Sequence, residues 1–258
     1  MNRKLISSAS CAGYLICVVA LMGCRARPAA SSGFIEQPQM MSVQDKNAAF
    51  QRAYWDPKFK FDNYDKLVVA PVNMHYMLTQ SFWEKANEAN VSKEDVQKSA
   101  DRIAEYTRNA FIKAAKEDPK HHFTVVDQPG AGPGASAKTL ILETAIVQLV
   151  PSKAVLQALG FVSWIPTAVM LGGSTLSQSE DQGKGVVAIE ARVRDAASGQ
   201  VVGMFADREH PPTAIIDIKS INWWAPARKI IDNWASQFIA TANGKKPKNS
   251  SNLELLVW

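Results

Sequence analysis

Residues 185–207 read GVVAIEARVRDAASGQVVGMFAD, and this stretch decides the fold class. Apolar and polar side chains alternate along its first half, and a period of two is that of a β-strand with one buried face. The side chains predicted to face the core are Val187, Ile189, Ala191 and Val193, and those predicted to face away are Glu190, Arg192 and Arg194. Ser198-Gly199 predicts a turn, after which residues 201–207 return as the partner strand. The stretch therefore predicts an antiparallel hairpin.

Three more strands and one long helix are predicted before the hairpin. The short apolar runs typical of strands are residues 67–72, 123–126 and 139–150. Pro71 predicts that the first run ends there or lies at a sheet edge. Ser92 and Asp95 resemble a capping box, which predicts a helix from there to about Lys116. Its apolar face comprises Val96, Ala100, Ile103, Thr107, Ala110, Phe111 and Ala114.

A second helix is predicted after the hairpin, over residues 225–242. Pro226 in its first turn and Asn243-Gly244 after its last turn are typical of helix ends. Its buried stripe comprises Ala227, Ile230, Ile231, Trp234 and Phe238. The order strand, helix, strand, strand, hairpin, helix predicts an α+β fold. We expect a two-layer domain, a mostly antiparallel sheet with helices packed on one face.

The chain begins with the features of a bacterial lipoprotein signal. Arg3 and Lys4 form a cationic start, and a mostly apolar run of about 17 residues ends at Leu21. The run closes on Leu-Met-Gly-Cys, which resembles a lipobox with cleavage after Gly23 and lipid attached to the thiol of Cys24. A membrane-spanning helix is the alternative, and the run lies at the lower limit of length for one.

The predicted anchor also indicates a location. Three acyl chains on Cys24 would exceed the two membrane signals that stable anchoring needs. Arg25 follows the cysteine, whereas an aspartate there usually retains a lipoprotein in the inner membrane. We therefore expect a lipid-anchored protein of the cell envelope, at the periplasmic face of the outer membrane rather than in the inner membrane.

The sequence divides into four predicted segments. They are a signal peptide (1–23), a flexible tether (24–50), the α+β domain (51–244) and a C-terminal tail (245–258). The tether prediction rests on the small and turn-forming residues around Pro28 and on weak periodicity. A flexible tether of this length reaches a few tens of ångströms.

Composition excludes several functional classes. The net charge of +5 falls to +3 when Arg3 and Lys4 leave with the signal, and so small an excess does not predict nucleic-acid binding. Cys11 and Cys17 also leave with the signal and Cys24 carries lipid, so no disulfide or cysteine metal site is expected. No Gly-Lys-Ser/Thr phosphate loop or Gly-x-Ser-x-Gly motif occurs. We expect no cofactor and no metal.

The densest polar group of the sequence ends the predicted hairpin and reads Asp207-Arg208-Glu209-His210. On a strand, the two acidic residues share one face and the two basic residues share the other. Paired carboxylates on one face could act as acid and base or hold a cation. The alternative is an ion-paired strand edge, opposite Glu190, Arg192 and Arg194.

Residues 154–179 carry no charge. Gly160, Pro166 and Gly172-Gly173 divide the segment into halves too short to span a bilayer. It could be a buried pair of short helices, a patch that dips into the membrane, or a docking surface for a partner. The possible interaction surface comprises Leu159, Phe161, Trp164, Ile165 and Met170.

Several short segments resemble a known family. They are residues 32–34, 54–55, 64–66, 188–195, 204–209 and 230–235, of which Phe-Ala-Asp-Arg-Glu (205–209) and Ile-Asp-Asn-Trp-Ala (231–235) are fairly specific. These segments are similar to proteobacterial lipoproteins of the domain-of-unknown-function family 3313. The resemblance covers most of the chain after Cys24 and ends before residues 253–258. It implies an envelope lipoprotein and brings no catalytic residues.

Two functions are therefore weighed. The first is a non-enzymatic, membrane-anchored envelope lipoprotein that binds a protein partner or a membrane component as an accessory subunit. The second is a hydrolase, or a protein that binds a small ligand or a cation, using Asp207, Glu209 and His210. Convergence of these side chains in one pocket would favour the second.

Overall fold

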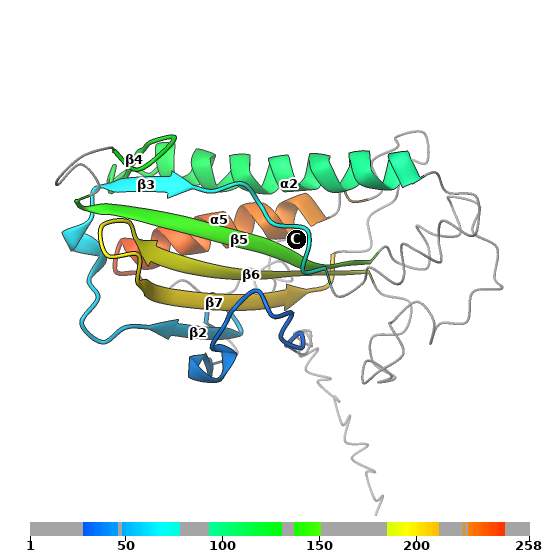
Figure 1. Cartoon of the computed structure of the whole chain (residues 1–258), viewed down its shortest axis with the longest axis horizontal. Coiled ribbons are helices and arrows are strands. Elements are labelled where there is room, and N and C mark those ends of the chain that lie inside the picture. The colour runs from blue at the N-terminus through cyan, green and yellow to red at the C-terminus, as the bar shows by residue number, and fades with distance from the viewer. Residues whose placement is uncertain are drawn as a thin grey trace, which may run out of the picture.

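The computed structural model describes residues 28–45, 48–77, 93–130, 137–150, 185–211, 224 and 227–245. Within these residues, one seven-stranded sheet has the order β1-β2-β7-β6-β5-β3-β4 (Figure 1). The strands are β1 (Ser42–Val43), β2 (Arg52–Trp55), β3 (Lys66–Val69), β4 (Thr124–Val125), β5 (Thr139–Val150), β6 (Val186–Asp195) and β7 (Val201–Glu209). The helices are α2 (Lys93–Lys116) and α5 (Ala227–Ala242), with the short 3-10 helices η1 (Pro38–Met40) and η2 (Phe61–Asn63).

The predicted hairpin is confirmed as β6 and β7, which pair antiparallel. The four apolar side chains predicted to face the core are all buried. At the turn, the Asp195 carboxylate accepts hydrogen bonds from the backbone N–H (2.6 Å) and the hydroxyl (2.8 Å) of Ser198. Gly199 has a φ of 72°, a conformation that glycine adopts without steric cost. Local sequence therefore accounts for both the strands and the turn.

The α+β fold class is confirmed, but the prediction of a mostly antiparallel sheet is wrong because the sheet is mixed. β3 runs parallel to both of its neighbours, β4 and β5, and the other pairs are antiparallel. The helix α2 separates β3 from β4 along the chain. Such a crossover returns the chain to its starting end, so the next strand runs in the same direction. Side-chain alternation reports which face a residue occupies and says nothing about strand direction.

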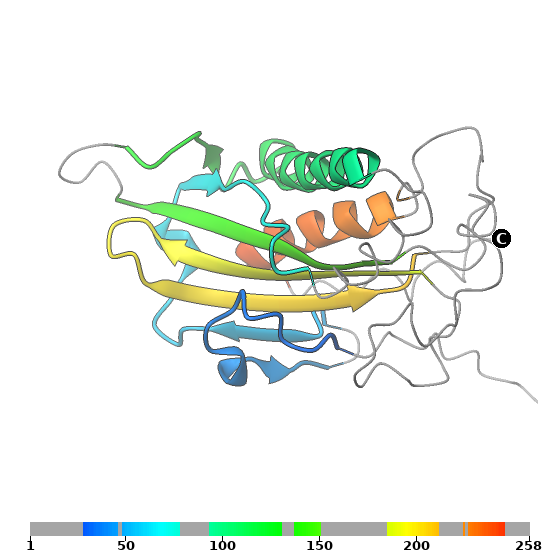
Figure 2. The ribbon, with the colours of Figure 1, turned by 45° about the vertical axis from the view of Figure 1, so that its right-hand side comes forward.

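The two helices and the sheet share one cluster of buried side chains. Phe111 of α2, Trp234 and Phe238 of α5 and Phe205 of β7 all belong to it and are fully buried. Figure 2 shows both helices on the same side of the sheet. The predicted stripe of α5 is buried throughout. In the part of the chain that the structure describes, neither helix combines the length and apolar character needed to cross a membrane.

The N-terminal segment lies on the opposite face of the sheet, which we call the outer face. Phe34, Ile35 and Met41 are buried there, in a second cluster with Ala145, Val147, Ala188 and Met204. Further along, β1 pairs with β2. Residues 28–45 and 48–50 are thus part of the folded structure and not of a flexible tether. Their weak periodicity misled the prediction because an irregular segment can pack on a surface that other strands provide.

Asp118 connects the ends of the two helices. Its carboxylate accepts hydrogen bonds from the backbone N–H groups of Lys120 (3.2 Å) and His122 (3.1 Å) and from the Asn243 side chain (2.8 Å). Burial raises the pKa of Asp118, but the hydrogen bonds from His122, Lys120 and Asn243 outweigh burial and hold the pKa below its ordinary value. Folding therefore favours the ionised carboxylate.

Replacing Asp118 by alanine is expected to lower the free energy of unfolding at neutral pH by about 2 kcal/mol, because three donors lose their acceptor. Asp118→Asn tests the charge alone. The folded pKa lies below the ordinary value of about 3.9, so the stabilisation is complete above that pH and is lost as the pH falls through the folded pKa. In urea unfolding, the difference between wild type and Asp118→Asn should narrow below about pH 4. A difference that stays constant into acid would contradict this.

Candidate functional site

The polar group predicted as a possible site lies at the end of β7 and comprises Asp207, Arg208, Glu209 and His210. β7 is an interior strand, because β2 pairs with it on one side and β6 on the other. The first three residues are at most 5% exposed, and the two acidic ones lie opposite Ile189 and Val187. The pairing with β2 ends at Ala206, and the three side chains just past it are nonetheless buried. The alternative of an ion-paired strand edge stays a prediction.

Asp207 and Arg208 point to opposite faces of the sheet. Asp207 accepts hydrogen bonds from the indole N–H of Trp234 (2.8 Å) and from the backbone N–H of Gln51 (3.1 Å). Arg208 points to the outer face, where its Nε donates to the Gln148 side chain (2.8 Å). Among the described residues, no three His, Cys, Asp or Glu side chains gather where they could hold a metal ion. The contact of Asp207 joins β7 to α5, and the contact of Arg208 joins β7 to β5.

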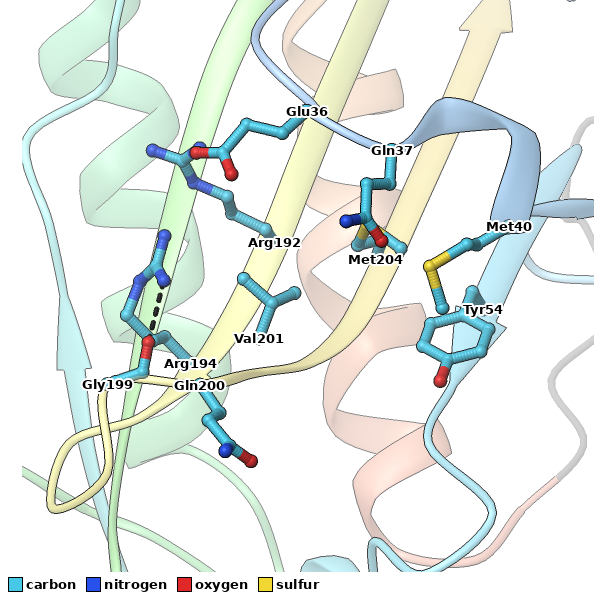
Figure 3. A pocket seen from close by; sticks show the side chains of 10 residues that line it. All are labelled: Glu36, Gln37, Met40, Tyr54, Arg192, Arg194, Gly199, Gln200, Val201 and Met204. Atoms are coloured by element: carbon cyan, nitrogen blue, oxygen red, sulfur yellow. Dashed lines mark hydrogen bonds and ion pairs between the residues drawn. The ribbon is translucent and has the colours of Figure 1, made fainter.

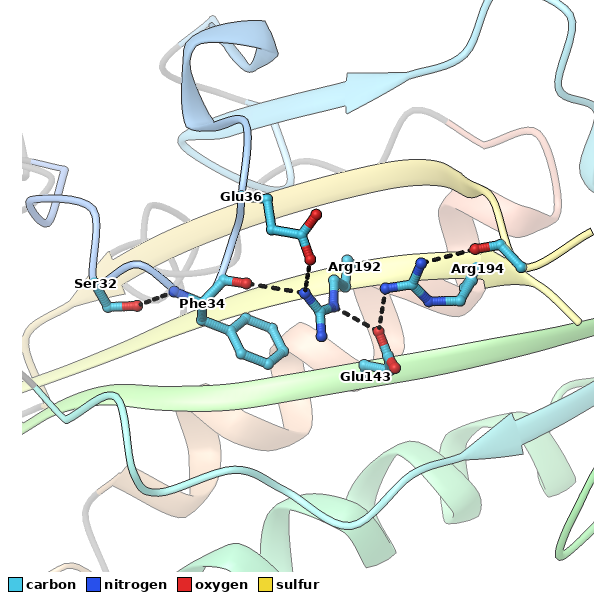
Figure 4. A network of polar contacts seen from close by, with 7 residues as sticks. Ser32, Phe34, Glu36, Glu143, Arg192 and Arg194 are labelled. Atoms are coloured by element: carbon cyan, nitrogen blue, oxygen red, sulfur yellow. Dashed lines mark hydrogen bonds and ion pairs between the residues drawn. The ribbon is translucent and has the colours of Figure 1, made fainter.

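A strap, defined as residues 28–41, crosses the outer face. The backbone N–H and hydroxyl of Ser32 donate to the buried Glu190 carboxylate (3.1 and 2.7 Å). The Arg192 guanidinium lies 4.5 Å from the centre of the Phe34 ring and donates to the Phe34 carbonyl oxygen at 3.1 Å (Figure 4). Gly33, between these two attachments, has a φ of 91°, which favours glycine. The strap is thus held to β6 by hydrogen bonds of its backbone and by the stacking of the Arg192 guanidinium on the Phe34 ring.

Four charged side chains form a network beside the strap. Glu143 of β5 lies opposite Arg192 of β6 and accepts hydrogen bonds from the Arg192 Nε (2.5 Å) and from Arg194 (3.3 Å). Glu36 of the strap lies 3.3 Å from Arg192 on the other side (Figure 4). Partly exposed ion pairs contribute about 1 kcal/mol or less each. The network therefore matters mainly for positioning the arginines, whose charges the two carboxylates balance.

A pocket of about 460 Å³ opens between the strap, β2 and the β6–β7 turn (Figure 3). Its floor is a row of paired positions on three neighbouring strands, Tyr54, Met204 and Arg192. The complete lining comprises Glu36, Gln37, Met40, Tyr54, Arg192, Arg194, Gly199, Gln200, Val201 and Met204. The volume is within the range of pockets that bind small molecules.

The lining of this pocket offers both polar and apolar contacts for binding. It contains no serine, cysteine, histidine or lysine that could act as a nucleophile or neutral base. The two arginines are already paired with carboxylates, and the amides of Gln37 and Gln200 accompany the apolar side chains of Met40 and Met204. The arrangement suits a ligand with both polar and apolar groups and a balanced charge.

Tyr64 supports the turn at the rim of the pocket. Its O–H donates to the Asp195 carboxylate at 2.8 Å. Burial, this hydrogen bond and the negative charge of Asp195 raise the pKa of Tyr64 to about 12. Burial also raises the pKa of Asp195, but the hydrogen bonds from Ser198 and Tyr64 lower it overall. At neutral pH the tyrosine is therefore a neutral donor and the aspartate an ionised acceptor.

The sequence patterns did not identify this pocket. The alternation of the strand predicts that Arg192 faces away from the core and offers it as an ion-pair partner, and the tether prediction includes the residues of the strap. The available signal was the apolar pair Phe34-Ile35 directly after Gly33, which is unusual in a solvated linker.

The remaining predicted sites lie outside the described residues and stay predictions. They are the cleavage site at Gly23, the lipidation site at Cys24 and the interaction surface of Leu159, Phe161, Trp164, Ile165 and Met170.

The structure defines an α+β protein whose mixed sheet carries two helices on one face and a strap with a small pocket on the other. A family model described as "Protein of unknown function (DUF3313)" matches residues 30–238. The chain belongs to this family. The match begins within the strap and ends in α5, so the family domain includes residues 30–50 of the segment expected to be a tether.

Comparison with individual proteins adds little. No curated protein matches the chain. Two solved structures of a PelC dodecamer from Paraburkholderia phytofirmans are each 11% identical to it, with TM-scores of 0.36 and 0.35. Both alignments cover 72% of this chain, and 96% and 94% of the PelC chains. At this identity and TM-score the likeness carries no argument about function.

Proposed function

We propose that the protein is a membrane-anchored envelope lipoprotein that acts by binding, as an accessory subunit that engages a protein partner or a membrane component. The observation that carries the proposal is the sequence Leu-Met-Gly-Cys at residues 21–24, after a cationic and then apolar start. The character of the outer face supports the binding role. Its pocket has polar and apolar walls, which suit a ligand or partner that carries both kinds of group.

Replacing Cys24 by alanine is expected to release the protein from the membrane fraction, because the thiol that would carry the lipid is gone. The fold should be unchanged, since Cys24 precedes the first residues packed on the sheet. Fractionation with metabolic palmitate labelling measures the first effect, and thermal unfolding measures the second. Unlabelled wild type, or a variant that stays in the membrane, would overturn the anchor.

Arg25→Asp provides a matched variant for location. It leaves Cys24 intact and introduces the residue associated with retention in the inner membrane. Density-gradient separation of the two membranes should find wild type in the outer membrane and the variant in the inner membrane. Wild type in the inner membrane would contradict the proposed location without affecting the proposed lipidation.

The binding role is tested by photo-crosslinking in cells from two positions. A crosslinking residue at Met40 lies in the pocket lining, whereas one at Lys113 lies on the exposed side of α2. A defined partner band from position 40 and none from position 113 is the expected result. Equal patterns from the two positions would argue against the outer face as the binding surface.

A further inference from the structure

The strap limits how far the folded domain can stand from a membrane that holds Cys24. Ala29 already packs against the apolar cluster of the outer face. Five peptide units separate Cys24 from Ala29, and an extended chain spans at most about 3.6 Å per residue, or roughly 18 Å in all. A flexible tether over residues 24–50 would instead reach roughly 30 Å on average and much further when extended. The link is therefore short.

The contacts of the strap also show from which end of the sheet it enters. Ser32 binds Glu190, and Phe34 and Glu36, which come next along the strap, bind Arg192. The strap thus runs in the same direction as β6 (Figure 4). Followed back toward Cys24, it leads toward the beginning of β6.

The two ends of the sheet are defined by strand pairing. At one end, which we call the entry end, Val150 of β5 pairs with Val186 of β6, and Val187 pairs with Glu209 of β7. At the other, the turn end, β6 and β7 are joined by the turn at residues 196–200. Strands of this length rise about 3.3 Å per residue, so roughly 30 Å separates the two ends.

We infer that the entry end of the sheet faces the bilayer and the turn end points away from it. This inference rests on the proposed lipidation of Cys24. The short link holds the beginning of β6 near the lipid, and the sheet carries the turn end about 30 Å further on. In the same orientation, Val150 and Val186 lie toward the lipid. These are the two residues at which the segment 151–184 joins the sheet.

Exposed lysines would favour the opposite orientation, in which the turn end faces the bilayer. They lie at the turn end, where α2 and α5 end and β5 begins, and comprise Lys113, Lys116, Lys120, Lys138 and Lys245. Basic side chains are attracted to anionic lipid near a charged membrane surface. The link of roughly 18 Å from the entry end opposes their contact with the membrane that holds Cys24.

The test uses the complete mature lipoprotein in vesicles, with one fluorophore per molecule. The mature sequence has no cysteine besides Cys24, so Pro211→Cys places a label at the entry end and Ala197→Cys a matched label in the exposed turn. Energy transfer to acceptor lipids in neutral vesicles should be several-fold stronger from position 211 than from position 197. Equal transfer, or stronger transfer from position 197, would overturn the orientation.

Two controls separate the possible causes. Mass spectrometry establishes acylation of Cys24 first; an unmodified cysteine overturns the anchor and the orientation together, whereas acylation with equal transfer overturns the orientation alone. A spacer of about 20 Gly and Ser residues inserted after Arg25 should weaken transfer from position 211 and reduce the difference between the labels. A difference that survives the spacer would show that the short link does not set the orientation.

Discussion

Replacing Trp234 by alanine is expected to lower the free energy of unfolding by about 3–5 kcal/mol. The indole is fully buried between α5 and the sheet, in the cluster that also contains Phe205 and Phe238. Its removal leaves a cavity in the core and takes a hydrogen-bond donor from the buried Asp207 carboxylate. Urea unfolding followed by circular dichroism measures the loss.

Trp234→Phe separates the hydrogen bond from the packing. Phenylalanine fills much of the same space but cannot donate to Asp207, so this variant should lose about 1–3 kcal/mol. If Trp234→Phe were as stable as wild type, the hydrogen bond would not contribute, and the structural role assigned to Asp207 would be contradicted. A stability loss confined to Trp234→Ala would then reflect packing alone.

Replacing Gly203 by alanine is expected to lower the free energy of unfolding by about 3 kcal/mol, at the upper end of the usual cost of overpacking. A Cβ atom at this position would lie 2.2 Å from two ring carbons of Trp55. Trp55 faces Gly203 directly in the pairing of β2 with β7, and its ring packs against Phe59 and Phe61. The ring therefore has little room to move away, and the strands must separate instead.

Two comparisons test this explanation. Gly199→Ala, in the same hairpin, meets no atom within 4 Å and has only the cost of a positive φ, about 1 kcal/mol. Combining Gly203→Ala with Trp55→Leu should restore part of the lost stability, because the smaller side chain leaves space for the Cβ atom. Additive effects of the two substitutions would rule out the steric contact as the cause.

The elements that local patterns define were predicted well. Three such features are the alternation of β6, the turn at Ser198-Gly199 and the apolar stripe of α5. Each depends on residues that lie close together in the sequence. Gly244, with a φ of 71°, ends α5 where the sequence indicated. Such features follow from side-chain period and from glycine conformation, which are properties of neighbouring residues.

The strap and the pocket depend instead on contacts distant in sequence. Ser32 binds Glu190, which is 158 residues away, and Arg192 packs on Phe34. The strap has no regular period because its residues pack on a surface supplied by β5, β6 and β7. No pattern within residues 28–41 could therefore indicate which of them would be buried.

The polar group at residues 207–210 also shows that sequence patterns do not reveal contacts between distant residues. Asp207, Arg208 and Glu209 resembled a site because charged residues gathered along the chain, and such residues are rarely buried. In the sheet, alternation places Arg208 on the face opposite Asp207, and all three side chains are buried. Their partners, Trp234 and Gln148, are neighbours only in space.

The sequence by itself determined the α+β class, the β6–β7 hairpin, the two helices and the family resemblance, and it predicts a lipid anchor at Cys24. Each depends on residue types at short, regular spacing. Only the tertiary structure decided the mixed strand directions, the burial of the strap and the pocket beneath it. Strand direction depends on the path of the connecting helix α2, and burial of an irregular segment depends on which surface it meets. Neither property is encoded by the period of the residues themselves.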